Sequence, residues 1–310
     1  MVAGFAVARG GICAVAGVKQ LIEAGRARIF LSFLECSAWA LLALIAANAV
    51  GLMSIAAWPS RMLVAGAVIG GVLFGLGALV NGACAFGTIA RLGSGEVSFL
   101  ALVPGFLFGV WSLRQAGMIT APPAASSTHI AGDVLTPVLF ALAAFALWRV
   151  LAAAQFARAP GRLRQLSVGA WPPALAVALI ALANVGLLLI VFSWPYTSLL
   201  ADIASGRDAE IFGRAILALA LFAGAISGAA SAGMYRFRPP GMGDIVRHFG
   251  GGALMGAGAA MIPGGNDSLV LVGLPLLQPS AGAAYIAMVG AIAAGLAARR
   301  IWARRQSAQA

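Results

Sequence analysis

Apolar residues follow one another in long runs along this chain, and polar residues gather in the stretches between the runs. A helix needs about 20 apolar residues to cross a bilayer. The pattern predicts such helices near residues 4–22, 29–52, 61–92, 96–114, 133–157, 172–193, 211–234, 248–277 and 280–302. We therefore expect an all-α polytopic membrane protein with about nine transmembrane helices, built as a single integral membrane domain over residues 1–310.

Composition supports a membrane protein. Hydrophobic residues make up 62% of the chain and charged residues only 9%, whereas about a quarter of a soluble protein is charged. The net charge of +11 is spread between and after the apolar runs rather than gathered in one patch. We interpret the basic residues as determinants of membrane topology, and we do not expect the protein to bind nucleic acid.

The basic residues also predict an orientation, because loops on the cytoplasmic side carry an excess of lysine and arginine. Four groups fall on one side of the nine predicted helices: Lys19, Arg26 and Arg28; Arg158, Arg162 and Arg164; Arg236, Arg238 and Arg247; and Arg299, Arg300, Arg304 and Arg305. Placing all four groups in the cytoplasm puts the amino terminus outside and the carboxyl terminus inside.

Two glycine-rich segments resemble each other. "GGVLFGLGA" (70–78) recurs as "GGALMGAGA" (251–259), at an offset of 181 (251 − 70). Close helix packing alone accounts for such glycines. The predicted orientation, however, makes the two copies cross the membrane in opposite directions, as the inverted repeats of transporters do. We expect a first repeat half at 1–114, a linker with one span at 115–171, and a second half at 172–310.

Each glycine-rich segment runs into a predicted helix break, "NGAC" (81–84) in the first copy and "PGGND" (263–267) in the second. Broken helices at matching places in two repeats mark a substrate site near the middle of the membrane. A break also frees backbone amides, and an Asn before an apolar run is typical of a helix N-cap. The residues that we expect to line the site at the two breaks are Gly82, Cys84, Gly264, Gly265 and Asn266.

Four stretches of the chain together resemble the YeeE/YedE sulfur-transport family: residues 4–25, 70–96, 194–206 and 234–267. The resemblance implies import of thiosulfate or a related sulfur anion across the bacterial inner membrane, through nine helices with broken central members. It also implies that thiols pass the substrate inward without covalent chemistry. Cys13 and Cys84 match the first and second thiol positions. The family context further implies a small cytoplasmic sulfur-carrier protein as a partner.

The third thiol of the family pattern is missing, because that position holds Gly265. Family members carry cysteine there, so we expect the backbone to accept a Cβ, although a glycine at a break can also be required for positive φ. The departure leaves three functions open: transport of thiosulfate, transport of another sulfur species, or sensing.

Other polar residues receive structural interpretations. We expect Cys36 to be a packing residue, Glu35 to be salt-bridged near Arg26 and Arg28, and His248 to be structural. Arg9 lies one turn before Cys13 and could receive an anion. "WPYT" (194–197) suits an aromatic belt at the membrane interface, or alternatively a vestibule to which Thr197 contributes. Asp267 is left out of the site, because it would repel a dianion unless it is protonated or turned away.

These observations favour a permease that imports thiosulfate or a similar sulfur anion. The alternative is a non-transporting membrane sensor or partner protein that binds a sulfur compound in sulfur oxidation. No histidine pair, carboxylate dyad or CxxC motif occurs, so we expect no enzyme activity, no cofactor and no metal site. A thiol oxidoreductase is disfavoured because the three cysteines include no paired resolving cysteine.

Overall fold

The structure is a computed structural model. It describes residues 1–52, 59–60, 64–118, 126–127, 132–158, 166, 169–191, 194–207, 210–262 and 264–307. Helices dominate these residues, and the two-residue strands β1 (Pro59–Ser60) and β2 (Ser126–Ser127) pair antiparallel. The predicted all-α class is confirmed.

The amino-terminal part of the chain forms a series of helices. They are α1 (Val2–Gly10), α2 (Ala14–Ala24), α3 (Arg28–Ala49), α4 (Val64–Asn81), α5 (Ala85–Gly93), the 3₁₀ helix η2 (Val97–Ala101) and α6 (Leu102–Gln115). The break between α4 and α5 falls where the sequence predicts it. The first span, predicted as one helix over 4–22, is instead split into α1 and α2. Gly11 ends α1 in a left-handed conformation (φ 60°), which a glycine adopts without strain.

The rest of the chain repeats this order of elements. After α7 (Gly132–Arg158) come α9 (Pro173–Ile190), α10 (Tyr196–Ala204), α11 (Ile211–Ser231), α12 (Met242–Met261), α13 (Asn266–Ser268), the π-helical turn η3 (Leu269–Gly273) and α14 (Pro279–Ser307). The second predicted break is present between α12 and α13; Pro263 within it lies outside the described residues.

Among the described residues, seven segments are long and apolar enough to cross a membrane: Val2–Ala24, Arg28–Ala49, Ala65–Gly93, Val97–Gln115, Pro173–Ile190, Ile211–Ser231 and Pro279–Ser307. Each coincides with one of the predicted spans. The predicted spans 133–157 and 248–277 do not meet the same criteria, although α7 contains a shorter apolar stretch, Phe140–Gln155. The multi-pass architecture is supported, and the count of nine stays a prediction.

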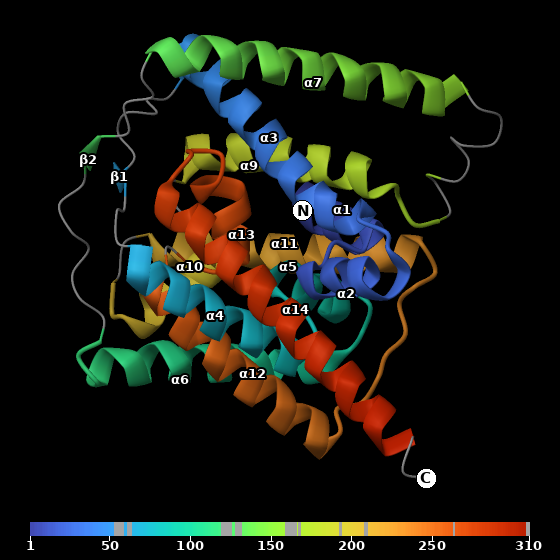
Figure 1. Cartoon of the computed structure of the whole chain (residues 1–310), viewed down its shortest axis with the longest axis vertical. Coiled ribbons are helices and arrows are strands. Elements are labelled where there is room, and N and C mark those ends of the chain that lie inside the picture. Colours follow the sequence, from blue (N-terminus) through green and yellow to red (C-terminus); the bar gives the residue numbers. More distant parts are fainter. Residues whose placement is uncertain are drawn as a thin grey trace.

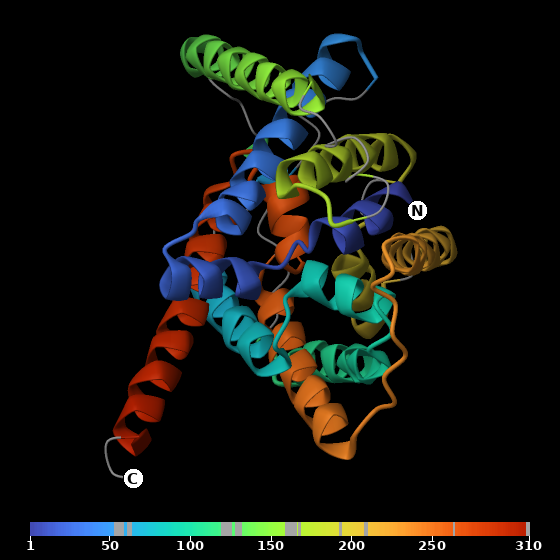
Figure 2. The same cartoon turned by 90° about the vertical axis from the view of Figure 1, so that its right-hand side faces the viewer.

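Corresponding helices of the two parts pack in a reciprocal way. Helix α1 packs on α11 and α3 on α9, while α6 packs on α12 and α14 on α4. Helices α4 and α12 cross each other at the centre, beside α14 (Figures 1 and 2). Two halves related by a pseudo-twofold axis would make this set of contacts.

The repeated glycines lie at the crossing of α4 and α12. A Cβ on Gly70 would lie 2.8 Å from the Gly258 carbonyl oxygen, and a Cβ on Gly77 would lie 2.7 Å from the Gly251 carbonyl oxygen. The offset of 181 pairs Gly70 with Gly251 and Gly77 with Gly258, so the two contacts are exchanged between the repeat copies. Any side chain at these positions would push the two backbones apart.

The remaining repeated glycines face the outer partners of the same two helices. A Cβ on Gly75 of α4 would meet the Met288 carbonyl oxygen of α14 at 2.5 Å, and one on Gly256 of α12 would meet the Phe106 carbonyl oxygen of α6 at 2.1 Å. Close packing, one of the two explanations of the glycine motif, is therefore confirmed. It explains why both copies need small residues at the same places.

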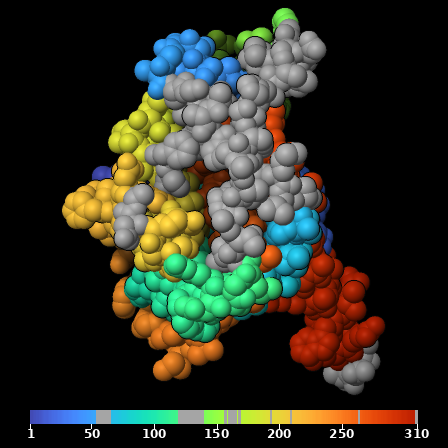
Figure 3. Space-filling model, turned by 90° about the vertical axis from the view of Figure 1, so that its left-hand side faces the viewer, coloured from blue at the N-terminus to red at the C-terminus, as the bar shows by residue number. Residues whose placement is uncertain are grey.

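Two helices extend from the packed centre. Helix α7 lies across one end of the molecule (Figure 1) and contacts α3 through an Arg149–Glu35 ion pair at 2.7 Å and through the Phe145 and Trp39 rings. Glu35 is thus salt-bridged, as expected, but its partner comes from α7 and not from Arg26 or Arg28. At the other end, exposed residues 297–307 of α14 project from the body (Figure 3).

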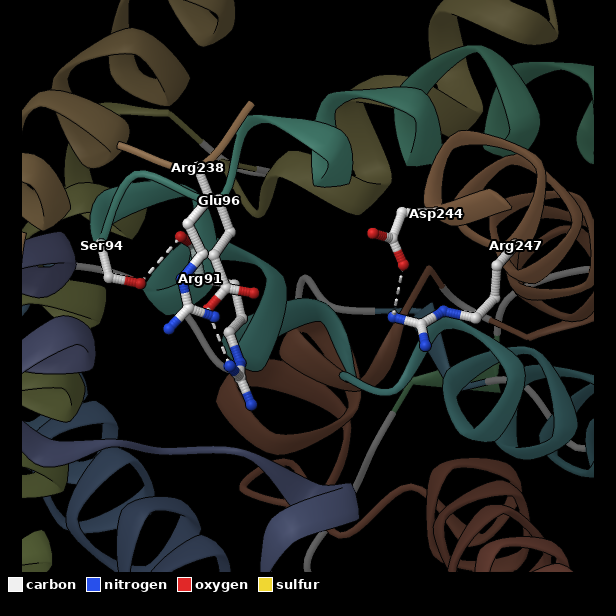
Figure 4. Close-up of polar contacts among 6 residues, drawn as sticks. All are labelled: Arg91, Ser94, Glu96, Arg238, Asp244 and Arg247. Atoms are coloured by element: carbon white, nitrogen blue, oxygen red, sulfur yellow. Dashed lines mark hydrogen bonds and ion pairs between the residues drawn. The ribbon is translucent and has the colours of Figure 1, made fainter. Parts of the chain in front are cut away.

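The end of α5 away from the break is held by a polar cluster (Figure 4). The Glu96 carboxylate pairs with Arg91 at 2.8 Å and with Arg238 at 3.5 Å. The Arg236 and Arg238 backbone N–H groups donate to the carbonyl oxygens of Ser94 and Gly95, both at 2.9 Å. These contacts fix the C-terminal end of α5 and so help to fix the position of its first residue.

Candidate functional site

Three helices of the broken segments begin at the candidate residues. Cys13 is the N-cap of α2, Cys84 is the N-cap of α5, and Gly265 is the N-cap of α13. All three have extended backbone conformations, in which the following N–H groups are left without partners in their own helix. A helix start of this kind presents backbone donors, which favour an anion.

The two thiols of the first half lie against each other. The Cys13 and Cys84 side chains are hydrogen-bond partners, and the Ala14 N–H at the start of α2 donates to Cys84 Sγ at 3.1 Å. Cys84 is fully buried, whereas Cys13 is partly exposed. The structure therefore places Cys13 at the more open side of the pair and Cys84 at the more enclosed side.

Gly87 keeps room for this pair, and the sequence analysis missed it. A Cβ on Gly87 would lie 2.5 Å from Cys13 Sγ, a distance that no real contact allows. Gly87 comes one helical turn after Cys84 on α5, so a glycine at that spacing in "NGACAFG" was the available signal.

Asn266 joins the two breaks. Its Oδ1 accepts a hydrogen bond at 3.0 Å from the N–H of Ala85, the first residue of α5. Asn266 is fully buried, and its Nδ2 has no hydrogen-bond partner among the described residues. The Ala85 N–H can donate only to an oxygen, so the amide atom facing it is Oδ1. The nitrogen Nδ2, with its two N–H donors, therefore points the other way. Leaving such a donor unpaired costs about 1–3 kcal/mol.

Gly264 and Gly265 shape the second break in different ways. Gly264 has a φ of +87°, and a Cβ on it would lie 2.5 Å from Ser268 Oγ and 2.6 Å from Ser198 Oγ. Gly265 has a φ of −83°, which any residue can adopt, and its N–H donates to Thr197 Oγ1 at 2.9 Å. Both glycines are buried.

The expectation that the backbone at Gly265 accepts a Cβ agrees with its φ of −83°, but the space into which a side chain would point is occupied. The backbone would allow a side chain, but its Cβ would lie 2.7 Å from Thr197 Oγ1 and 2.9 Å from Thr197 Cβ. Thr197 is the second residue of α10, and its fully buried side chain occupies this space. A threonine hydroxyl therefore lies beside the position where the family pattern has its third thiol.

Gly82 has another role at the first break. Its φ of +79° turns the chain out of α4, and its surroundings are open enough for a Cβ. The neighbouring Asn81 side chain holds the turn, since its Nδ2 donates to the Ala83 carbonyl oxygen at 2.8 Å and to Thr88 Oγ1 at 3.2 Å. His248 Nδ1 lies 2.7 Å from Asn81 Oδ1. His248 therefore has a structural role, which is to hold the Asn81 side chain in place at the break.

Several other residues are placed by the structure. Arg9 donates to the Gly169 carbonyl oxygen at 2.6 Å and to Ser231 Oγ at 3.0 Å. Cys36 is buried in the hydrophobic core, as expected of a packing residue. Tyr196, which the sequence analysis did not single out, donates its hydroxyl to the Ala85 carbonyl oxygen at 3.1 Å.

The arrangement suits a soft anion better than a metal or a reaction. Among the residues that the structure describes, no three His, Cys, Asp or Glu side chains gather as a metal site requires. The groups that converge are thiols, an amide and helix starts, which donate weak or neutral hydrogen bonds without burying a fixed positive charge.

Comparisons with known proteins agree with this chemistry. A family model described as sulphur transport matches residues 9–294, which include every candidate residue. The chain is also similar to the thiosulfate transporter TsuA of Escherichia coli (strain K12). The two are 26% identical over an alignment of 294 residues. The alignment covers 84% of this chain and 81% of that protein.

Proposed function

The chain belongs to the sulphur transport family, and we propose that it is a permease importing thiosulfate or a related sulfur anion across the bacterial inner membrane. Its amino terminus lies outside and its carboxyl terminus in the cytoplasm. The two halves, 1–114 and 172–310, form an inverted repeat joined by the linker 115–171. The reciprocal packing of their helices supports this repeat.

One observation carries the proposal: the hydrogen bond from the Ala85 N–H to Asn266 Oδ1, between residues 181 positions apart. It joins the two breaks, so a substrate at one break is within reach of groups from both halves. Transporters built from inverted repeats bind their substrates at such a junction of broken helices. Asn266 Nδ2, which has no partner in the part of the chain that the structure describes, is a donor that an anion would satisfy.

The path starts at Cys13, the more exposed thiol, and continues at Cys84, which is buried. Thiosulfate carries a soft terminal sulfur, which a thiol can contact by a weak hydrogen bond. The side-chain amide of Asn266 donates to the thiosulfate oxygens. Because no lysine or arginine is needed in the constriction, the anion is not held too tightly to leave.

Gly264 and Gly265 supply the second half of the site. With no thiol at Gly265, the polar side chains beside it are those of Thr197 and Asn266. This departure from the three-thiol pattern is the observation that favours the alternative function, a sensor that binds a sulfur compound without moving it.

Uptake into liposomes separates the two functions. Purified protein is reconstituted, and labelled thiosulfate is followed both as bound ligand in detergent and as label inside the vesicles. A permease accumulates internal label above protein-free vesicles, and unlabelled thiosulfate inside accelerates the exchange. Binding in detergent without any flux into vesicles would refute the permease and support the sensor.

A further inference from the structure

Asp267 is a buried carboxylate that the thiol path does not use. Its side chain is 3% exposed, and no Lys, Arg or His forms an ion pair with it among the described residues. The Thr197 hydroxyl donates to Asp267 Oδ1, and the Thr197 N–H donates to Oδ2 at 3.4 Å. A carboxylate without a cationic partner is costly to bury, so its retention next to the second break requires an explanation.

The charged and titratable groups on the elements packed against Asp267 do not compensate its charge. Helix α10 carries Tyr196 beside it and Asp202 at its far end, where Asp202 pairs with arginines. Helix α5 has Cys84 as its N-cap and carries Arg91 in its last turn, paired with Glu96. The turn η3 carries no ionisable side chain.

The Thr197 hydroxyl links Asp267 to the site. Its oxygen accepts the Gly265 N–H at 2.9 Å, and its single hydrogen is donated to Asp267. A hydroxyl has one hydrogen and two acceptor positions. When Asp267 is ionised, that hydrogen is occupied. When Asp267 carries a proton, its own O–H can donate to Thr197, and the threonine hydrogen becomes free to turn toward an anion at the break.

We propose that Asp267 binds the proton that accompanies each imported anion. Protonation of Asp267 frees the Thr197 hydroxyl hydrogen, which then donates to the substrate. This inference rests on the proposed function and adds a proton-coupled mechanism to it. A dianion and an ionised carboxylate in the same buried space repel each other, so the anion binds best when a proton enters with it. Thr197 then donates to the anion beside Gly265, where the family pattern has a thiol.

The first test uses the wild-type protein in liposomes. With the membrane potential held at zero, an exterior more acidic by one pH unit should raise the internal to external thiosulfate ratio about tenfold for one proton per anion. A pH-sensitive dye should report protons entering together with thiosulfate. Thiosulfate entry with no proton movement and no response to the gradient would overturn the inference and leave the permease standing. Absence of any thiosulfate entry would overturn both.

The second test assigns the coupling to Asp267. The variant Asp267→Asn keeps the shape of the side chain but cannot take up a proton at the pH values of the assay. It should still exchange internal for external thiosulfate at equal pH, but it should lose the tenfold accumulation. The matched control is Asp244→Asn, which removes an exposed carboxylate paired with Arg247 and should respond to the gradient as wild type does. An unchanged gradient response in Asp267→Asn would refute the assignment.

A pair of variants at Thr197 keeps the assignment testable if Asp267→Asn does not fold. Thr197→Ser retains the hydroxyl and should remain coupled, whereas Thr197→Val has nearly the same shape without it and should lose most of the gradient response. Equal coupling in both variants would show that the hydroxyl does not link Asp267 to the anion.

Discussion

Replacing Gly265 with cysteine would restore the three-thiol pattern of the family, and the structure predicts that it harms this protein. The Gly265 φ of −83° suits cysteine, so the backbone adds no strain. The new Cβ, however, would lie 2.7 Å from Thr197 Oγ1 and 2.9 Å from Thr197 Cβ and Cγ2. The substitution must therefore displace a buried, β-branched side chain.

The size of the effect follows from two terms. Overpacking of a well-packed interior costs about 1–3 kcal/mol. Displacement of Thr197 also weakens its hydrogen bond with the Gly265 N–H, which contributes about 0.5–1.5 kcal/mol. We expect Gly265→Cys to lower the midpoint of thermal unfolding in detergent and to reduce thiosulfate uptake. Gly265→Ala adds the same Cβ without the thiol and should show a similar loss of stability.

A double-mutant cycle isolates the steric cause. In a Thr197→Ala background two of the three close atoms, Oγ1 and Cγ2, are gone, so Gly265→Cys should destabilise the protein much less. The expected coupling is about 1 kcal/mol or more, as for residues in direct contact. Equal destabilisation by Gly265→Cys in both backgrounds, or a stable single variant with full uptake, would refute this reasoning.

Three further predictions concern the breaks and the topology. Asn266→Asp keeps an acceptor for the Ala85 N–H but removes the free donor and adds charge, so the apparent KM for thiosulfate should rise at least about tenfold; an unchanged KM would exclude Asn266 from binding. His248→Leu leaves Asn81 Oδ1 without its partner and should destabilise the protein by about 1–3 kcal/mol in thermal unfolding, whereas a wild-type melting curve would contradict its supporting role. A reporter inserted within 115–131 should be external and one after residue 305 cytoplasmic, and the same side for both would contradict the proposed orientation.

The sequence was most informative where the physical constraint is local or repeated. Long apolar runs predict helices because only a helix satisfies its backbone in a membrane. Glycines such as Gly70 and Gly251 predict close helix crossings, and "NGAC" and "PGGND" predict breaks. The split of the first span at Gly11 was predictable in principle, since a glycine pair precedes Cys13. It was missed because apolar residues continue on both sides of the interruption at Arg9 and Gly10.

The sequence was least informative where a contact depends on distant residues. Nothing near Gly265 indicates that Thr197 fills the space beside it, because the two meet only after α10 packs on the second break. The partner of Glu35 was assigned to nearby arginines, and the fold supplied Arg149 of α7 instead. Arg9 could have received an anion beside Cys13 on sequence grounds, yet acceptors distant in the sequence engage it. Residue types predicted polar roles, and tertiary packing selected the partners.

The central claim is that a buried thiol at the first break carries a sulfur anion through the membrane. The most direct measurement compares the initial rate of labelled thiosulfate uptake by wild-type, Cys84→Ala and Cys36→Ala protein in liposomes, at equal amounts of folded protein. We predict uptake by wild type and by Cys36→Ala at similar rates, because Cys36 only packs in the core, and no uptake above protein-free vesicles by Cys84→Ala. Full uptake by the Cys84→Ala protein would contradict the account.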